Sequence, residues 1–225
     1  MPSRNRIKDY QKDSYYHIYN RGVEKKEIFR DTQDYSVFLT YLKNYLLPKD
    51  EESLNEIIQN RHSTPSDKEK ARRLLQLNNF NGEIFLLAYC LMPNHFHFLI
   101  KQKDYKTMDK FMNSLGTRYT MYFNKKYKRV GSLYQGVYNA VLVHTDEQLL
   151  NLSRYIHKQA QLIPSLSGSG QPSSYSIFTR TEKSEWIYPE EILSYLAQEY
   201  PKFTYKTLLN EESDWDLIHN FTLEE

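Results

Sequence analysis

Two histidines separated by one residue are the first feature of the sequence that could do chemistry. His95 and His97 follow the breaker Pro93-Asn94 inside residues 86–100, the longest apolar run of the chain. An apolar run, a breaker and a second apolar run predict two buried antiparallel strands joined by a tight turn. Alternation along a strand puts both imidazoles on one face, roughly 7 Å apart. There their ring nitrogens can share a divalent metal ion.

The same pair also has an ordinary structural interpretation. Two histidines at the end of a hairpin can simply be hydrogen-bonded to their neighbours. A strand buried on both faces is normally a continuous run of Val, Ile and Leu, and buried polar rings are costly without partners. The position of His95 and His97 inside an apolar run therefore favours a shared metal as the partner.

A tyrosine and a carboxamide form a second candidate pair. The capping box Thr145-Asp-Glu-Gln148 opens a predicted helix that runs to about residue 163. Tyr155 and Gln159 are four residues apart in it, so they share one face. A tyrosine oxygen can attack phosphorus while a carboxamide oxygen helps to hold a metal. The alternative is an ordinary exposed helix face, because the chain has 20 tyrosines.

The elements that must position these side chains alternate between strand and helix. Strand formers, turn residues and apolar spacings of three and four residues define them. The predicted order is strand 15–22, helix 31–47, helical insert 48–80, hairpin 83–101, helix 106–127, strand 137–143 and helix 145–163. This order indicates an α+β fold with an antiparallel sheet.

Three regions are predicted along the chain. Residues 1–14 read as a basic N-terminal arm and residues 15–164 as the main domain. Residues 165–225 begin with a linker rich in Ser and Gly and continue as an acidic extension. The short apolar groups of this extension are expected to pack onto the main domain.

Charge is unevenly distributed along the chain. The net charge is +2, but residues 182–225 carry 3 Lys or Arg against 11 Asp or Glu, so they carry −8 and residues 1–181 carry +10. A basic body favours a polyanionic partner. Basic residues interleaved with tyrosines at the end of helix 106–127 are typical of nucleic-acid binding, although cations also favour helix C-termini. The candidates are Arg118, Lys125, Lys126 and Arg129, with Arg21 of the Arg-Gly turn as a possible phosphate contact or a simple turn residue.

Cysteine content and hydropathy favour a reducing, cytoplasmic setting. Cys90 is the one cysteine, so no disulfide can form within the chain. The longest apolar run is far below the roughly 18 residues needed to span a bilayer. The polar N-terminus does not have the pattern of a signal peptide.

Four segments together resemble the HUH single-tyrosine transposases, in particular the insertion-sequence-200-like group and its REP-associated relatives. They are Tyr16-His-Ile-Tyr-Asn-Arg-Gly22, Met92-Pro-Asn-His-Phe-His97, residues 119–138 and Arg154-Tyr-Ile-His-Lys-Gln159. Ser173-Ser-Tyr175 followed by Trp186-Ile187 is similar to the carboxy-terminal segment of the REP-associated branch. That branch usually has Tyr-Ile-Glu-Leu-Asn-Pro in the tyrosine helix, so this chain departs from it. The insert 48–80 departs from both branches.

The resemblance implies a fold and a set of site residues. The fold would be a ferredoxin-like antiparallel sheet with helices packed on one face, plus the helical insert and the C-terminal extension. Tyr155 would be the nucleophile, and His95, His97 and Gln159 would hold Mg²⁺ or Mn²⁺. The partner would be single-stranded DNA with a hairpin, with no membrane involved and a homodimer as one arrangement.

The activity implied is a transposase or nickase that cuts and rejoins single-stranded DNA through a 5′-phosphotyrosine intermediate. Two other classes fit parts of the sequence. A non-catalytic single-stranded DNA or RNA binder would use the same fold with its aromatic residues. A mononuclear metal hydrolase would use water and leave Tyr155 without a role.

Overall fold

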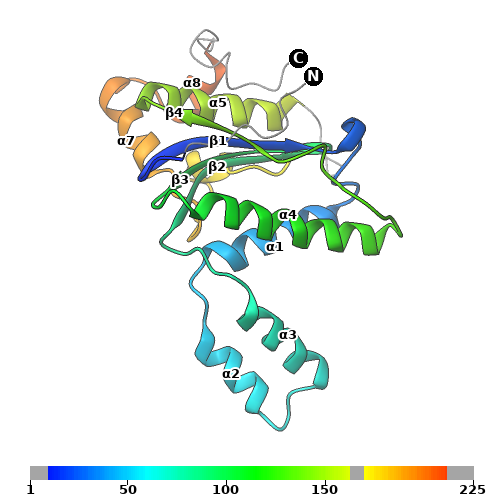
Figure 1. Ribbon diagram of the computed structural model, residues 1–225. Coiled ribbons are helices and arrows are strands. Elements are labelled where there is room, and N and C mark those ends of the chain that lie inside the picture. Colours follow the sequence, from blue (N-terminus) through cyan, green and yellow to red (C-terminus); the bar gives the residue numbers. More distant parts are fainter. Residues whose placement is uncertain (1–9, 163–169, 212–225) are drawn as a thin grey trace.

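One four-stranded sheet lies at the centre of the protein, in the order β2-β3-β1-β4 with every neighbouring pair antiparallel. The computed structural model describes residues 10–162 and 170–211. The sheet and the helices that cover it are β1 (Ser14–Arg21), α1 (Thr32–Leu46), β2 (Ile84–Met92), β3 (His95–Gln102), α4 (Thr107–Lys126), β4 (Asn139–Val143) and α5 (Asp146–Leu162) (Figure 1). The smaller elements are η1 (Val23–Lys25), α2 (Glu51–Gln59), α3 (Pro65–Gln76), α6 (Tyr175–Phe178), α7 (Glu190–Glu199) and α8 (Tyr205–Asn210).

The predicted α+β fold is confirmed. The order β1-α1-β2-β3-α4-β4 is the β-α-β-β-α-β arrangement of ferredoxin-like sheets. Each predicted strand and helix of this unit is present, with ends within two residues of the predicted ones. Among the described residues, no helix is long and apolar enough to cross a membrane. The predicted basic arm falls largely on residues 1–9, which lie outside the described residues.

Helices cover both faces of the sheet, which corrects the expectation that they pack on one face only. Helices α1 and α4 lie on one side, as expected, while α5 and the C-terminal helices lie on the other (Figure 1). Two separate apolar clusters result, one on each face. The apolar composition of β2 and β3 explains the second layer, because strands buried on both faces must be covered on both.

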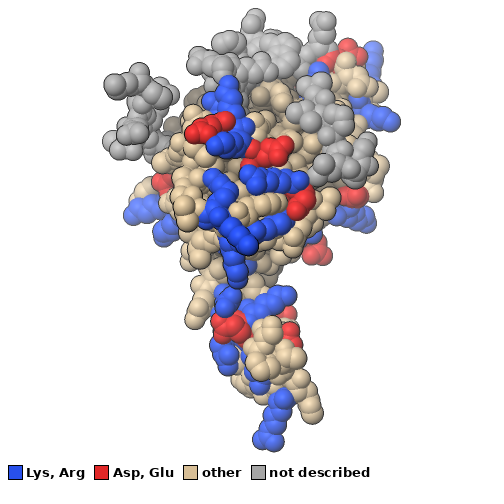
Figure 2. Space-filling model, turned by 90° about the vertical axis from the view of Figure 1, so that its right-hand side faces the viewer, with Lys and Arg blue, Asp and Glu red and all other residues tan. Residues whose placement is uncertain are grey.

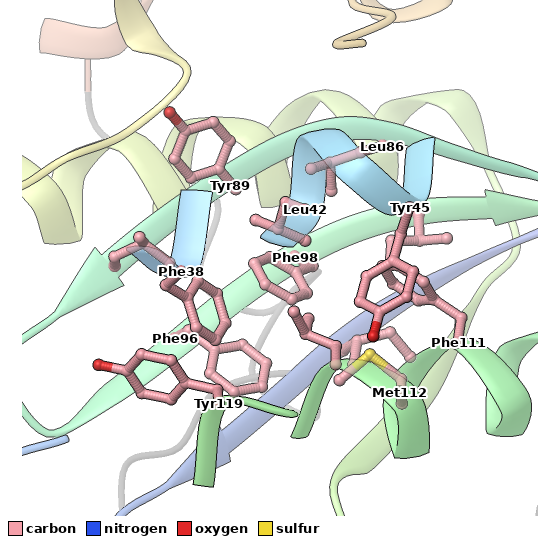
Figure 3. Packing of buried hydrophobic residues seen from close by; sticks show 14 of the residues in the cluster. Phe38, Leu42, Tyr45, Leu86, Tyr89, Phe96, Phe98, Phe111, Met112 and Tyr119 are labelled. Atoms are coloured by element: carbon pink, nitrogen blue, oxygen red, sulfur yellow. The ribbon is translucent and has the colours of Figure 1, made fainter. Parts of the chain in front are cut away.

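An aromatic core holds the first face together and fixes the turn before His95. Phe38 of α1 meets the ring of Tyr119 of α4 edge-on, with centroids 4.8 Å apart, and Phe38 also lies against Phe98 of β3, with centroids 6.2 Å apart (Figure 3). The Tyr119 hydroxyl donates to the Ile28 carbonyl at 2.7 Å. The N–H of Ile28 in turn donates to the carbonyl of Pro93 at 2.8 Å. The core therefore anchors the β2–β3 turn from which the histidine pair begins.

The described part of the C-terminal extension packs on the main domain. Residues 172–174 run beside β2, where Leu91 N–H donates to the Pro172 carbonyl at 2.9 Å and Ser174 N–H to the Tyr89 carbonyl at 3.1 Å. Further along, Tyr188 N–H donates to the Leu86 carbonyl at 2.9 Å. These bonds cover the outer edge of β2, which would otherwise expose unpaired backbone groups.

The insert 48–80 forms a helical arm, α2 and α3, that projects away from the body (Figure 1). Of its two helices, only Ala71 is buried. Hydrogen bonds close the base of the arm, where Asn79 Nδ2 donates to the Leu47 carbonyl at 2.8 Å and Phe80 N–H to the Tyr45 carbonyl at 2.8 Å. The arm is therefore a separable addition to the sheet unit.

Replacing residues 51–76 by a short Gly-Ser linker should leave the body folded, because the bonds at the base of the arm remain. We expect the melting temperature to change by less than about 5 °C. Asn79→Ala in the full chain is the matched control, and it should cost about 1–2 kcal/mol by leaving the Leu47 carbonyl without its partner. Loss of the cooperative unfolding transition on excision, followed by circular dichroism, would show that the arm is part of the core.

Candidate active site

The two histidines of β3 lie beside each other on the face covered by α5. His97 is completely buried, and His95 is half-buried at the start of the strand. Their ring centroids are 5.0 Å apart and their planes nearly perpendicular, at 89°. His95 Nδ1 lies 2.6 Å from Asn94 Oδ1 of the turn. The turn thus holds the His95 ring through Nδ1, so Nε2 is the ring nitrogen that remains available to a ligand.

A third histidine joins the pair from the neighbouring strand. The register of β1 against β3 sets Tyr19 opposite His97 and His17 opposite Leu99. His17 is completely buried, and its Nε2 lies 2.9 Å from Nδ1 of His97. The two ring planes are nearly parallel, at 13°, with centroids 5.1 Å apart. Sequence reasoning placed His17 and Tyr19 on one face of their strand but did not include His17 in the site.

Tyr155 reaches the same cluster from α5. Its ring lies edge-on to His97, with centroids 5.6 Å apart, and edge-on to His17 at 6.3 Å. The side chain is 2% exposed, because α5 packs on β2 and β3 in the second apolar cluster. Thr145 caps this helix as predicted, since Gln148 N–H donates to Thr145 Oγ1 at 3.1 Å, but Gln148 Oε1 accepts from the N–H of His144 and not from that of Thr145. Helix α5 therefore has a fixed start ten residues before Tyr155.

Gln159, the remaining predicted ligand, is half-buried one turn after Tyr155 on α5. Between them, His157 is fully buried and faces the extension instead of the histidine cluster. Its Nδ1 lies 2.7 Å from the Tyr205 hydroxyl, and its Nε2 lies 2.8 Å from Ser174 Oγ. Burial lowers the pKa of His157 to about 3, so the ring is neutral. This departure from the REP-associated pattern thus connects α5 to α8 and residue 174.

Burial keeps the histidine pair neutral. It lowers the pKa of His97 well below the usual value of 6.5, and it lowers that of His95 to about 4, with a further contribution from the charge of Arg21. A neutral imidazole is the form that binds a metal ion. At neutral pH both rings therefore have a lone pair available for a ligand.

The imidazole nitrogens of His95 and His97 and the carboxamide oxygen of Gln159 are atom types that bind divalent metal ions. In the described part of the chain, His97 Nε2 is buried and has no hydrogen-bond partner, which is costly unless something else satisfies it. No group of three or more His, Cys, Asp or Glu suited to a metal exists among residues 10–162 and 170–211. A site here would therefore combine the two imidazoles with a donor of another type, such as the Gln159 carboxamide.

Arg21 lies at the half-buried end of the histidine cluster, next to His95. It ends β1 opposite His95, and its Nε donates to Gln135 Oε1 at 2.8 Å. Gly22 lets the chain turn back tightly here, since a Cβ at this position would lie 2.0 Å from the Lys26 carbonyl oxygen. The fold of this loop thus holds a guanidinium next to the half-buried imidazole.

Lys and Arg side chains form a band over the same end of the sheet, where β1 and α4 finish (Figure 2). We use "basic band" for six of the half-buried or exposed cations of the loops and helix end located there, of which Lys26 is paired with Glu24: Arg21, Lys25, Lys26, Arg30, Lys125 and Lys128. Two contacts hold the loop of this band in place: Asn94 Nδ2 of the β2–β3 turn donates to the Lys25 carbonyl, and Arg30 lies 4.6 Å over the Tyr127 ring at the end of α4. The histidine cluster therefore borders a surface that attracts anions.

Three predicted nucleic-acid contacts have partners inside the fold. Arg118 stacks 3.8 Å over the Tyr41 ring, and Arg129 Nη1 donates to Asn124 Oδ1 at 3.4 Å. Lys126 Nζ lies 2.7 Å from oxygens of both Asp31 and the fully buried Asp34. Lys125, in contrast, is exposed. The sequence could not separate these cases, because their partners come from distant segments.

Comparison with known proteins finds a family model that matches part of the chain. Residues 57–159 match the model of the family described as "Transposase IS200 like". Among solved structures the chain is similar to a REP-associated tyrosine transposase bound to a REP hairpin, with 10% identity and a TM-score of 0.45 over 84% of this chain and 90% of that one. It is also similar to a candidate transposase from Deinococcus radiodurans R1, with 12% identity and a TM-score of 0.36 over 69% and 98% of the two chains. A search of curated proteins gives no match.

The family match includes His95, His97, Tyr155 and Gln159. Residues 57–159 therefore match the IS200-like transposase family, and this match supports the resemblance found in the sequence. The match supports a transposase function.

Lys126→Ala and Lys125→Ala should separate structural cations from surface ones. Removal of Lys126 leaves the buried Asp34 carboxylate without its cation, so we expect a loss of about 3 kcal/mol in the free energy of unfolding. Removal of the exposed Lys125 should change it by less than about 0.5 kcal/mol. Urea unfolding measures both, and equal, small changes in the two variants would contradict the structural role of Lys126.

Proposed function

We propose that the protein cuts and rejoins single-stranded DNA with Tyr155 as the nucleophile. The observation that supports this most strongly is the approach of Tyr155 on α5 to His97 on β3, with ring centroids 5.6 Å apart. These residues are 58 positions apart in the sequence, and they meet next to the basic band. A phenol, neutral imidazoles and cations together are the groups that phosphoryl transfer to tyrosine needs.

The proposed reaction conserves the energy of the phosphodiester. The Tyr155 oxygen attacks phosphorus, a bond between that oxygen and phosphorus forms, and the bond from phosphorus to the 3′ oxygen breaks. The phenol loses its proton, and the departing 3′ oxygen gains one. The product is a 5′-phosphotyrosine and a free 3′-hydroxyl, and attack by another 3′-hydroxyl reverses the step and rejoins the strand.

The other side chains have supporting roles in this proposal. His95, His97 and Gln159 would hold Mg²⁺ or Mn²⁺, which when bound stabilises negative charge on the phosphoryl oxygens. Arg21 would contact the phosphate beside His95, and Lys125 with the rest of the basic band would follow the neighbouring phosphates. Arg118, Lys126 and Arg129 stay predicted contacts, although each also has a partner in the fold. We propose a stem-loop in the single strand as the feature that is bound.

Tyr155 and both histidines come from one copy of the chain in this arrangement. A second copy is therefore not needed to complete the proposed site, and a homodimer stays a prediction. We also propose a cytoplasmic setting for the protein.

A non-catalytic nucleic-acid-binding protein is the second candidate. The burial of Tyr155, at 2% exposure, favours it, because a nucleophile must reach its phosphate. In this case the aromatic and basic groups would bind a strand without cutting it. Incubation with Mn²⁺ distinguishes the two candidates, since only the first gives a covalent product.

Tyr155→Phe should abolish a covalent complex that wild type forms with a labelled stem-loop oligonucleotide and Mn²⁺, because the phenol oxygen is the nucleophile. Tyr19→Phe is the matched control, since its ring is also near His97, at 5.9 Å, and it should still form the complex. Denaturing gels detect the complex, and filter binding should give the same affinity for all three proteins. A complex with Tyr155→Phe would refute the assignment.

His95→Ala should reduce Mn²⁺-dependent cleavage at least ~100-fold, because it removes one proposed ligand. The exposed His62 of the arm provides the control, and His62→Ala should cleave at the wild-type rate. Initial rates on the same oligonucleotide give the comparison, with circular dichroism to verify folding. An unchanged rate in folded His95→Ala would remove the metal from the proposal.

A further inference from the structure

His17 is a buried polar side chain at a position that an aliphatic residue would fill. On β1 it lies opposite Leu99 of β3 and Val141 of β4, and it is completely buried. A buried imidazole in such a place loses its hydration and destabilises the fold unless its polar atoms find partners. Its contact with His97, at 2.9 Å, is therefore the feature that needs a reason.

The contact between the two rings allows only two arrangements of protons. His97 Nδ1–H can donate to His17 Nε2, which leaves His97 Nε2 with a bare lone pair. In the other arrangement His17 Nε2–H donates to His97 Nδ1, and His97 Nε2 then carries a proton that no described residue accepts. Only the first arrangement leaves a lone pair on the buried Nε2 of His97, so a cation bound at that atom requires His17 to be the acceptor.

We infer that His17 is a positioning residue that accepts a hydrogen bond from His97 Nδ1–H and so directs the Nε2 lone pair of His97 toward a divalent cation. This rests on the proposed metal site and extends it to a residue outside the ligand set. The contact between the two ring nitrogens and the nearly parallel ring planes, at 13°, also hold the His97 ring in one orientation. Partners of this kind orient metal-binding histidines in general, and their loss usually weakens metal affinity 10–100-fold.

The tautomer of His97 is the first test, and it needs no variant. In the metal-free wild-type chain, nitrogen-15 chemical shifts of the imidazole should show Nδ1 of His97 protonated and Nε2 bare. His97→Gln identifies which signals belong to this ring. Protonation at Nε2 instead would overturn the inference, whatever the catalytic activity of the protein.

Mn²⁺ affinity is the second test, measured on the full chain by electron paramagnetic resonance. His17→Leu keeps the volume but removes the acceptor, so its affinity should fall 10–100-fold. His17→Gln keeps an acceptor oxygen and should retain most of the affinity, and Tyr19→Phe should match wild type.

Two results would count against the inference in different ways. Unchanged Mn²⁺ affinity in folded His17→Leu would overturn the positioning role alone and leave the proposed function in place. A wild-type protein that binds no Mn²⁺ would overturn the inference together with the metal part of the proposed function. Loss of covalent complex in Tyr155→Phe is independent of both.

Discussion

The pairing of β1 with β3 is the constraint on which the site depends. It places Tyr19 opposite His97 and brings His17 within hydrogen-bonding distance of that ring. A shift of one residue would move the side chains of β1 to the other face of the sheet. The aromatic core opposes such a shift, because Ile18 and Tyr16 would then leave the first apolar cluster. The same register that fills the core therefore assembles the histidines.

The second layer of helices makes the other half of the site. Helix α5 covers the face that carries His17 and His97, and it brings Tyr155 with it. The extension fastens this helix through His157, Tyr205 and Ser174, and Arg154 Nη2 adds a bond to the Glu211 carbonyl at 2.9 Å. Burial of the polar rings of His17, His97 and His157 costs stability. In the proposed metal site this burial is useful, because it keeps the imidazoles in the neutral form that binds a metal ion.

Periodicity was sufficient to predict the local parts of this arrangement. Alternation placed His95 and His97 on one face, and helical spacing placed Tyr155 and Gln159 on another, because both patterns depend on neighbours in the sequence. The contact of His17 with His97 and the ion pair between Lys126 and Asp34 could not be predicted in this way, because they depend on which distant segments come together. The second helical layer was implied by the apolar runs of β2 and β3 but was not expected.

The central claim is that Tyr155, set against His97 by α5, becomes linked to DNA. The most direct measurement is mass spectrometry of the protein after reaction with a stem-loop oligonucleotide, nuclease trimming and proteolysis. We expect a nucleotide remnant attached through its 5′ phosphate to the peptide that contains Tyr155. A remnant on the peptide that contains Tyr19, or a cleaved oligonucleotide with no modified peptide, would contradict it.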